Sequence, residues 1–258
     1  MVEIIFLGTG GGRVNLISQQ RRTAGFRINA SMNFHIDPGP GSMLACKEFS
    51  QDPRKTNVLI VTHSHIDHVN DAGLVIEAMT NYALSKQGYL IASSSVIDGD
   101  KYGDRSISRY HQLKMAKIFI AKAGKEVRIG CGRKQASLLP TKVKHEDKTG
   151  FGFVLKIDGK SIGYTSDTEY FKELPTPFAG CDVLIANVIK PAQDSLAGHL
   201  HAQSAAELFF KCKPKLGIIT HLGIKMIEAG PEKEAERIAK LSGVPTIAAF
   251  DGLKLQIP

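Results

Sequence analysis

The chain has 258 residues, of which 43% are hydrophobic and 22% are charged. This composition is that of a folded globular protein, and it excludes a disordered chain, a collagen-like repeat and a miniprotein held together by disulfides. No apolar run approaches the roughly 18–20 residues needed to cross a bilayer, and the N-terminus lacks the basic start of a signal peptide, so we expect a cytoplasmic protein that does not enter a membrane.

Short apolar runs of strand length recur along the chain, with a few helical patterns between them. The predicted strands cover residues 2–7, 57–62, 89–92, 117–121, 138–144, 152–157, 161–165, 182–187, 216–220, 246–250 and 254–257. Helices are predicted over residues 67–83, from a capping box that begins at Ser204, and over residues 231–242 between Pro231 and Gly243. Residues 93–100 are expected to form a surface loop. No linker divides the chain, so we expect one α/β domain over residues 1–258, with more strands than helices.

Five residues rich in glycine, Gly8-Thr9-Gly10-Gly11-Gly12, follow the first predicted strand. No helical pattern follows them, so they do not fit a phosphate-binding loop for a nucleotide. We interpret them as a tight loop beside an active site.

A dense group of histidines, His63-Ser64-His65-Ile66-Asp67-His68, comes directly after the apolar run of residues 58–62. Burying these polar groups costs several kcal/mol unless each is paired or bound to metal. His63 and His65 point to the same side of an extended segment, since side chains alternate along a strand. Asp67 and His68 lie on the following turn and can face a neighbouring position, so the segment can serve two adjacent metal ions.

The pattern His-x-His-x-Asp-His resembles the signature of the metallo-β-lactamase superfamily. Three later predicted strands end near His145, Asp167 and His221, in the order of the superfamily's next motifs. The resemblance implies a four-layer αββα sandwich, in which helices flank two mixed β-sheets. It also implies one metal ion bound by His63, His65 and His145, a second bound by Asp67, His68 and His221, Asp167 as a bridge, and Asp37 as the acid that orients a ligand histidine.

An aspartate at position 167, in place of a cysteine, favours hydrolases with a bridged pair of ions over the lactamases of the superfamily. Two ions about 3.5–4 Å apart can hold a bridging hydroxide and clamp the oxygens of a phosphate ester. Zinc is the first choice because imidazoles dominate the ligand set, while manganese or iron also suits histidine with carboxylate. The implied function is a binuclear phosphodiesterase, with Asp67 as a catalytic residue as well as a ligand.

His199 looks like the additional histidine of the phosphodiesterase branch, which includes tRNA 3′-processing endonucleases and phosphoribosyl cyclic phosphodiesterases. In that branch this histidine contacts the scissile phosphate and is a candidate acid for the leaving group. His201 and Lys190 are candidate substrate-binding residues, although a surface position explains each of them as well. We interpret His35 as a structural residue and His111 as a surface residue.

The tRNA endonucleases carry a substrate-gripping arm between the motifs that match His145 and Asp167. Only 21 residues separate these two positions here, and a hairpin pattern fills them. This departure favours a smaller phosphodiester, of the nucleotide type, or another nucleic acid as the substrate. Superfamily relatives are often dimers, so a homodimer is expected.

The net charge of +8 is concentrated in residues 101–134, which hold ten Lys or Arg residues against Asp104 and Glu126. A local positive field attracts phosphates or nucleic acid, while a solvated lysine-rich surface explains the charge equally well.

Two functions other than a phosphodiesterase stay open. One is a thioester or lactone hydrolase with the same metal centre, and the other is a nucleic-acid-binding module whose metal site is structural.

Four cysteines, Cys46, Cys131, Cys181 and Cys212, are far apart in the sequence and form no CxxC pair. In the cytosol this spacing favours reduced and mostly buried thiols. We do not expect them to bind metal.

Overall fold

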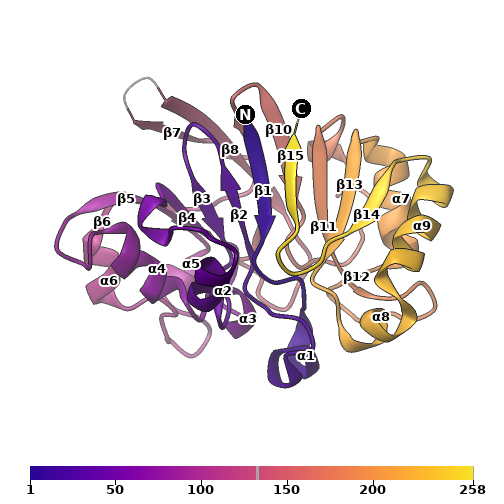
Figure 1. The fold of residues 1–258 in the computed structure, drawn as a ribbon, viewed down its shortest axis with the longest axis horizontal. Coiled ribbons are helices and arrows are strands. Elements are labelled where there is room, and N and C mark those ends of the chain that lie inside the picture. Colours follow the sequence, from indigo (N-terminus) through magenta and orange to yellow (C-terminus); the bar gives the residue numbers. More distant parts are fainter. Residues whose placement is uncertain (132–133, 258) are drawn as a thin grey trace.

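Two β-sheets pack face to face in the computed structural model, which describes residues 1–131 and 134–257 (Figure 1). In spatial order, the first sheet consists of β15 (Lys254–Ile257), β1 (Val2–Phe6), β2 (Phe26–Asn29), β3 (Phe34–Ile36), β4 (Val58–Val61), β5 (Gln87–Ala92) and β6 (Met115–Ile120). The second consists of β14 (Thr246–Ala248), β13 (Leu216–Thr220), β11 (Val183–Lys190), β10 (Lys160–Tyr164), β9 (Phe151–Ile157), β8 (Lys134–Lys142) and β7 (Val127–Cys131), with β12 (Leu200–His201) beside β11. Neighbouring strands are parallel from β3 to β6 and from β10 to β14, and antiparallel elsewhere, so both sheets are mixed.

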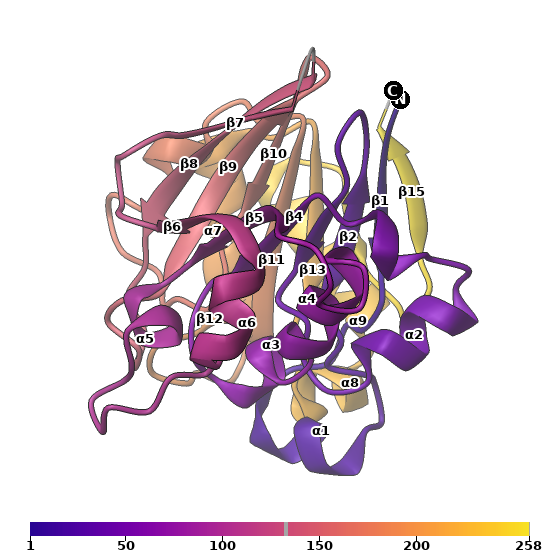
Figure 2. The same ribbon diagram turned by 90° about the vertical axis from the view of Figure 1, so that its left-hand side faces the viewer.

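Helices cover the outer face of each sheet, which gives the four layers of the expected αββα sandwich (Figures 1 and 2). The first sheet carries α2 (Ser42–Glu48), α3 (Ile66–Val69), α4 (Ala72–Met79), α5 (Ser94–Ile97) and α6 (Arg109–Lys114). The second sheet carries α7 (Ala202–Cys212), α8 (Ile224–Ala229) and α9 (Pro231–Ser242). The remaining helical segments are α1 (Gly12–Ser18) and the short 3₁₀ turns η1 (Pro53–Lys55) and η2 (Thr176–Phe178).

Apolar side chains from both sheets fill the space between them, for example Phe6 and Ile28 from the first sheet and Phe153 and Ile185 from the second. Burying one such side chain contributes about 1.5–3 kcal/mol, so this layer is the main source of stability. Every predicted strand is present, with ends shifted by a few residues. The strands that the sequence does not predict are β2, β3, β7 and β12, which have five residues or fewer.

The predicted helix over residues 67–83 is wrong, because the chain forms α3 and α4 with a break at Asp71. The Asp71 N–H donates to the Pro38 carbonyl oxygen over 2.8 Å, and the Asp71 carboxylate accepts from the Met43 N–H over 3.3 Å. These bonds to a distant loop replace the helical ones at that point. The predicted helix over residues 231–242 is confirmed as α9, which ends at Gly243 with a left-handed φ of 68°.

Two shorter predictions also differ from the structure. Residues 93–100 are not only a surface loop, because α5 lies within them and buries Val96 and Ile97 against the first sheet. The helix predicted to start at Ser204 begins at Ala202. Ser204 is the third residue of this helix, and its hydroxyl accepts from the His201 N–H over 3.0 Å.

The glycine-rich loop is followed by α1, which the sequence does not predict. The helix is stabilised locally by one side chain: the Asn15 amide donates to the Arg21 carbonyl oxygen over 2.6 Å and accepts from the Arg21 N–H over 3.1 Å. Because hydrogen bonds of an asparagine side chain stabilise this helix, its sequence does not need the hydrophobic periodicity by which helices are predicted.

The described residues of the basic segment, 101–131 and 134, lie on one side of the molecule (Figure 2) and include α6, β6 and β7. The last two are the edge strands of their sheets. Of its described basic side chains, all except the half-buried Lys114 are exposed, and only Arg128 makes an ion pair, with Glu126. Arg133 lies outside the described residues.

Cys46, Cys181 and Cys212 are buried free thiols, as expected, while the side chain of Cys131 lies outside the described residues. Among the helices of the described ranges, none is long and apolar enough to cross a membrane.

Candidate metal centre

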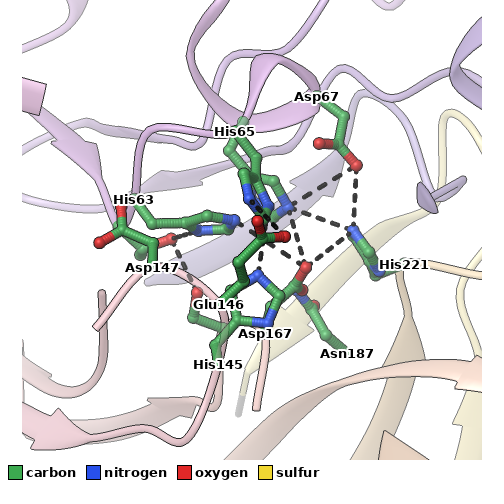
Figure 3. A network of polar contacts seen from close by, with 12 residues as sticks. His63, His65, Asp67, His145, Glu146, Asp147, Asp167, Asn187 and His221 are labelled. Atoms are coloured by element: carbon green, nitrogen blue, oxygen red, sulfur yellow. Dashed lines mark hydrogen bonds and ion pairs between the residues drawn. The ribbon is translucent and has the colours of Figure 1, made fainter. Parts of the chain in front are cut away.

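Strand ends bring the predicted site residues to one edge of the sandwich. His63 follows β4, Asp167 follows β10, and His221 follows β13, while Asp37 follows β3 directly. The carboxyl ends of parallel strands in open α/β sheets are common positions for functional side chains. The site is therefore assembled from segments that are far apart in the sequence (Figure 3).

The predicted ligands form two groups, and within each group one ligand atom per residue lies within 4.8 Å of the others. His63, His65, His145 and Asp167 form the first group, and Asp67, His68 and His221 form the second. The Asp167 Oδ2 atom lies between the groups, 3.9 Å from His63 Nε2 and 3.4 Å from His221 Nε2. This is the partition that the sequence predicts.

Hydrogen bonds orient two of the rings through the nitrogen that does not face the cluster. His68 Nδ1 donates to Asp37 Oδ2 over 3.0 Å, and His145 Nδ1 donates to the Gly198 carbonyl oxygen over 2.9 Å. The Asp37 carboxylate is itself fixed, because it accepts from the Thr62 N–H over 2.7 Å and from the Tyr164 hydroxyl over 3.0 Å. Such contacts set the tautomer and direction of a ligand histidine.

The other ring nitrogens face one another across the cluster. His65 Nδ1 lies 3.1 Å from His145 Nε2, and His68 Nε2 lies 3.1 Å from His221 Nε2. His63 Nε2 is buried and has no hydrogen-bond partner. Leaving a buried polar atom unpaired costs about 1–3 kcal/mol, and a cation among these nitrogens and carboxylates would satisfy all of them. Imidazole with carboxylate is a ligand set that suits zinc and neighbouring divalent metals, so the residues fit a metal centre.

The electrostatics of the cluster keep the carboxylates ionised. Burial alone would raise the pKa of Asp167, but His221 and His68 hold the pKa of this carboxyl well below its usual range. Burial lowers the pKa of His63 well below its usual value. Charged acids and a neutral imidazole are the forms that bind a metal ion.

Gly11 lies directly against the ring of His221. A Cβ atom at this position would be 2.2 Å from His221 Nδ1, so only glycine allows the ring to occupy its place. The expectation that the glycine-rich loop lies beside the site is met by Gly11 and Gly12, which line the same cavity as His221.

The cavity over the cluster has a volume of about 1080 Å³ and is also lined by His199 and Lys190. His199 Nε2 lies 3.4 Å from Asp167 Oδ2. His201 lies at the N-cap of α7 and, within the described lining, is not a cavity residue. His35 is fully buried beside Arg27, as expected of a structural residue, and His111 is half-buried against Glu77.

Two residues of the site received no role from the sequence. Asn187, in the middle of β11, donates from Nδ2 to Asp167 Oδ1 over 2.7 Å. Glu146 follows His145 and places Oε2 3.8 Å from His65 Nε2. Asn187 is the last residue of the strand predicted over residues 182–187, and Glu146 directly follows a predicted ligand. These positions are the signal that could have indicated the two residues.

The sequence profile described as "Beta-lactamase superfamily domain" matches residues 32–222. The chain belongs to the metallo-β-lactamase superfamily. An uncharacterized protein of Methanocaldococcus jannaschii is 37% identical over 259 residues, which cover 99% of this chain and 95% of that protein. A metal-dependent hydrolase of Pelotomaculum thermopropionicum is 28% identical, covering 90% and 96% of the two chains, and ribonuclease Z of Sulfolobus acidocaldarius is 23% identical, covering 95% and 96%.

Solved structures of the superfamily share the fold at low sequence identity. The metallo-β-lactamase fold protein YhfI of Bacillus subtilis superposes with a TM-score of 0.76 at 16% identity, covering 98% of both chains. A diphosphatase of the PhnP family gives 0.72 at 16% identity over 100% and 98% of the chains. Zinc-bound PqqB of Methylobacterium extorquens gives 0.72 at 16% identity over 99% and 100%. Family membership and the ligand cluster together make the chain a metal-dependent hydrolase of the superfamily.

Proposed function

We propose that the protein is a phosphodiesterase with two divalent metal ions, and that its substrate is a phosphodiester of the nucleotide or nucleic-acid type. One observation carries the proposal. The Asp167 Oδ2 atom lies within 3.9 Å of His63 Nε2, within 3.4 Å of His221 Nε2 and within 3.4 Å of His199 Nε2. A bridging ligand and a proton donor are thus next to each other.

The first ion would be held by His63, His65 and His145 and the second by Asp67, His68 and His221, with Asp167 shared between them. Zinc is the first choice for these ligands, and the zinc-bound structure of PqqB supports it, while manganese or iron would suit the same set. When bound, such a pair supplies a nucleophile from water at neutral pH and neutralises charge on the phosphate oxygens.

His199 would donate the proton that the leaving oxygen needs. Its Nδ1–H donates to the Ala197 carbonyl oxygen over 3.1 Å, which leaves Nε2 facing the cavity as the site of the transferable proton. Burial opposes the charged form, but the hydrogen bond and charge of Asp167 raise the pKa of His199, so the ring is more readily protonated. A donor is of more use to a phosphodiester, whose leaving alkoxide is strongly basic, than to a thioester, whose leaving thiolate is only weakly basic.

The short segment between His145 and Asp167 and a lysine in the cavity support a small substrate with a phosphate group. Between His145 and Asp167 the chain forms the hairpin of β9 and β10, and no substrate-gripping arm is found among these residues. Lys190 lines the cavity and would interact with a phosphate oxygen. The relatives named ribonuclease Z and diphosphatase support a phosphate-containing substrate.

The test compares turnover of bis(p-nitrophenyl) phosphate with that of a thioester and a lactone, alongside metal content per chain. We expect phosphodiester turnover with two metal ions per chain. In His199→Ala, kcat for a dinucleotide, whose leaving alkoxide needs a proton, should fall by about 10²–10⁴ with unchanged metal content, which is the usual contribution of a general acid. Turnover of bis(p-nitrophenyl) phosphate, whose p-nitrophenolate leaves without a proton, should change much less, and the control His111→Ala should keep the wild-type rate on both substrates. Full phosphodiesterase activity in His199→Ala would contradict the assigned role, and preferential thioester or lactone turnover would contradict the substrate class.

A further inference from the structure

The cavity over the metal centre combines a polar floor with apolar walls. The polar residues that line it include His65, Asp67, His145, Asp167, His199 and His221. The walls are lined by apolar side chains from several elements, among them Val14, Ile17, Ile66, Ile189, Leu196 and Ile224. Pockets of this composition bind ligands by burying apolar surface, while a few polar groups fix the orientation.

Four of these wall residues are unusually exposed for aliphatic side chains. The exposed fraction is 67% for Val14, 84% for Ile17, 55% for Ile66 and 43% for Leu196. On α1 only Asn15 is buried, and Figure 1 shows this helix below both sheets. An apolar group of this kind, beside a polar site, is typical of a surface that a ligand covers.

Contacts at the base of α1 attach the helix to the metal centre. The Gly12 N–H donates to Asp67 Oδ2 over 3.2 Å. Across the cavity, Arg13 Nη2 lies 4.0 Å from Glu146 Oε2, and the same Glu146 atom lies 3.8 Å from His65 Nε2. Since a helix rises 1.5 Å per residue, Val14 and Ile17 lie within roughly 3–8 Å of Gly12 along the helix axis.

A phosphate held by metal ions at this centre would lie close to Asp67, which bonds to the first residue of α1, so a substituent on it would be within reach of the apolar face of that helix. A second charged phosphate group would gain nothing from that face, because aliphatic side chains offer a charged group no hydrogen bonds. An uncharged apolar group would remove the exposed aliphatic surface from water, at about 25 cal/mol for each Å² buried.

We infer that the substrate is a phosphodiester in which one ester group is uncharged and apolar, and that Val14 and Ile17 of α1 bind this group. The inference rests on the proposed phosphodiesterase activity and narrows its substrate class. This group is either a hydrocarbon chain or a nucleobase on its sugar. Both present uncharged surface that the aliphatic side chains of α1 can cover.

The first experiment measures kcat and KM for a series of p-nitrophenyl phosphodiesters whose second ester group is methyl, butyl, octyl or 5′-thymidyl. We expect KM to fall about tenfold from methyl to butyl, because partial burial of three methylene groups accounts for such a change, while kcat stays nearly constant. A lower KM for the octyl than for the thymidyl ester assigns the group to a hydrocarbon, and the reverse assigns it to a nucleobase. The inference is overturned when the methyl ester binds as well as the larger esters.

The second experiment uses the double variant V14S/I17S with the matched control L84S/L241S. Leu84 and Leu241 are also exposed, by 82% and 49%, and they lie outside the cavity lining. We expect the first variant to raise KM for the butyl ester about tenfold and to leave the methyl ester unchanged, because only the contact with the substituent is lost. Equal effects on both esters, or equal effects of the control, would contradict the inference.

The activity and the oligomeric state of the wild type provide two further controls. If wild-type protein turns over none of the four esters, the proposed function itself fails, whereas turnover without any dependence on the substituent overturns the inference alone. Light scattering on the wild type and on V14S/I17S decides whether α1 is instead a contact between two copies of the chain. Dissociation of a wild-type oligomer by the variant would overturn the inference.

Discussion

The amide of Asn187 donates from Nδ2 to Asp167 Oδ1 over 2.7 Å, and both side chains are buried. The same amide nitrogen lies 3.0 Å from the Tyr164 hydroxyl, which in turn donates to Asp37. These bonds leave the second oxygen of Asp167 free to face the histidines. Asn187 therefore links the carboxylate shared by the two ligand groups to the acid that orients His68.

We predict that Asn187→Ala lowers the affinity of the protein for metal about 10–100-fold, the usual effect of removing a hydrogen bond to a metal ligand. The Asp167 carboxylate loses the bond that sets its direction, so it must be ordered when the metal binds. Competition with a chelator measures the affinity. The control Asn33→Ala changes a half-buried asparagine that bonds to the Lys55 carbonyl oxygen, away from the site, and should bind metal like the wild type.

A second prediction concerns the contact between Gly11 and His221. The added methyl group of Gly11→Ala would lie 2.2 Å from the ring, so His221 has to move away from Asp67 and His68. We expect metal content to fall from two ions per chain toward one, measured by elemental analysis. Gly130→Ala is the matched control, because its nearest neighbour would be 3.9 Å away. Two ions in both variants would refute the role of Gly11.

The gathering of the candidate ligand residues could be predicted, because part of their signal is local and the rest follows from the family resemblance. His63, His65, Asp67 and His68 lie within six residues, and His145, Asp167 and His221 each lie close to the end of an apolar run. The carboxyl ends of parallel strands meet at one edge of a sheet, so the proximity of residues that follow such strands can be expected from the order of the elements.

The role of Asn187 and the apolar cavity wall could not be predicted in this way. The Asn187 amide reaches Asp167 because β10 and β11 pair in a particular parallel register, with Tyr164 opposite Ile185. A sequence does not give that register directly. The helix α1 depends on the bonds of Asn15 to Arg21, and the break before α4 depends on bonds of Asp71 to a distant loop. At Asp71 a tertiary contact overrides the local pattern, whereas at Asn15 local hydrogen bonds take the place of an apolar face.

A third prediction tests the basic segment as a nucleic-acid surface. In the variant K117Q/K122Q/K125Q, three exposed charges near β6 are removed. If these three lysines contact phosphates, a plot of log affinity for a single-stranded oligonucleotide against log salt becomes less steep in the variant. The magnitude of its negative slope decreases by about 2, since each phosphate contact contributes about 0.7 to it. We expect this change together with unaltered turnover of bis(p-nitrophenyl) phosphate. The control K172Q/K233Q/K240Q removes three exposed lysines elsewhere, and equal slopes in both variants would exclude the segment.

The last prediction concerns His35, which is fully buried away from the metal centre. Burial, and then the neighbouring charge of Arg27, lower the pKa of His35 well below its usual value. The ring is neutral in the folded protein, as its contact with Arg27 requires, because His35 Nδ1 lies 3.4 Å from Arg27 Nη1 and must accept its proton. In the unfolded chain the same ring binds a proton below about pH 6.5.

The unfolded state therefore binds more protons than the folded state once the pH falls below about 6.5, and the free energy of unfolding decreases with falling pH. One such histidine lowers it by about 2 kcal/mol between pH 7.5 and pH 5.0. In His35→Asn this contribution is absent, while the Asn oxygen can still accept from Arg27. We expect urea unfolding of the metal-free proteins to show that, as the pH falls from 7.5 to 5.0, the free energy of unfolding decreases by about 2 kcal/mol more in the wild type than in the variant. Parallel pH profiles for the two proteins would mean that folding does not lower the pKa of His35.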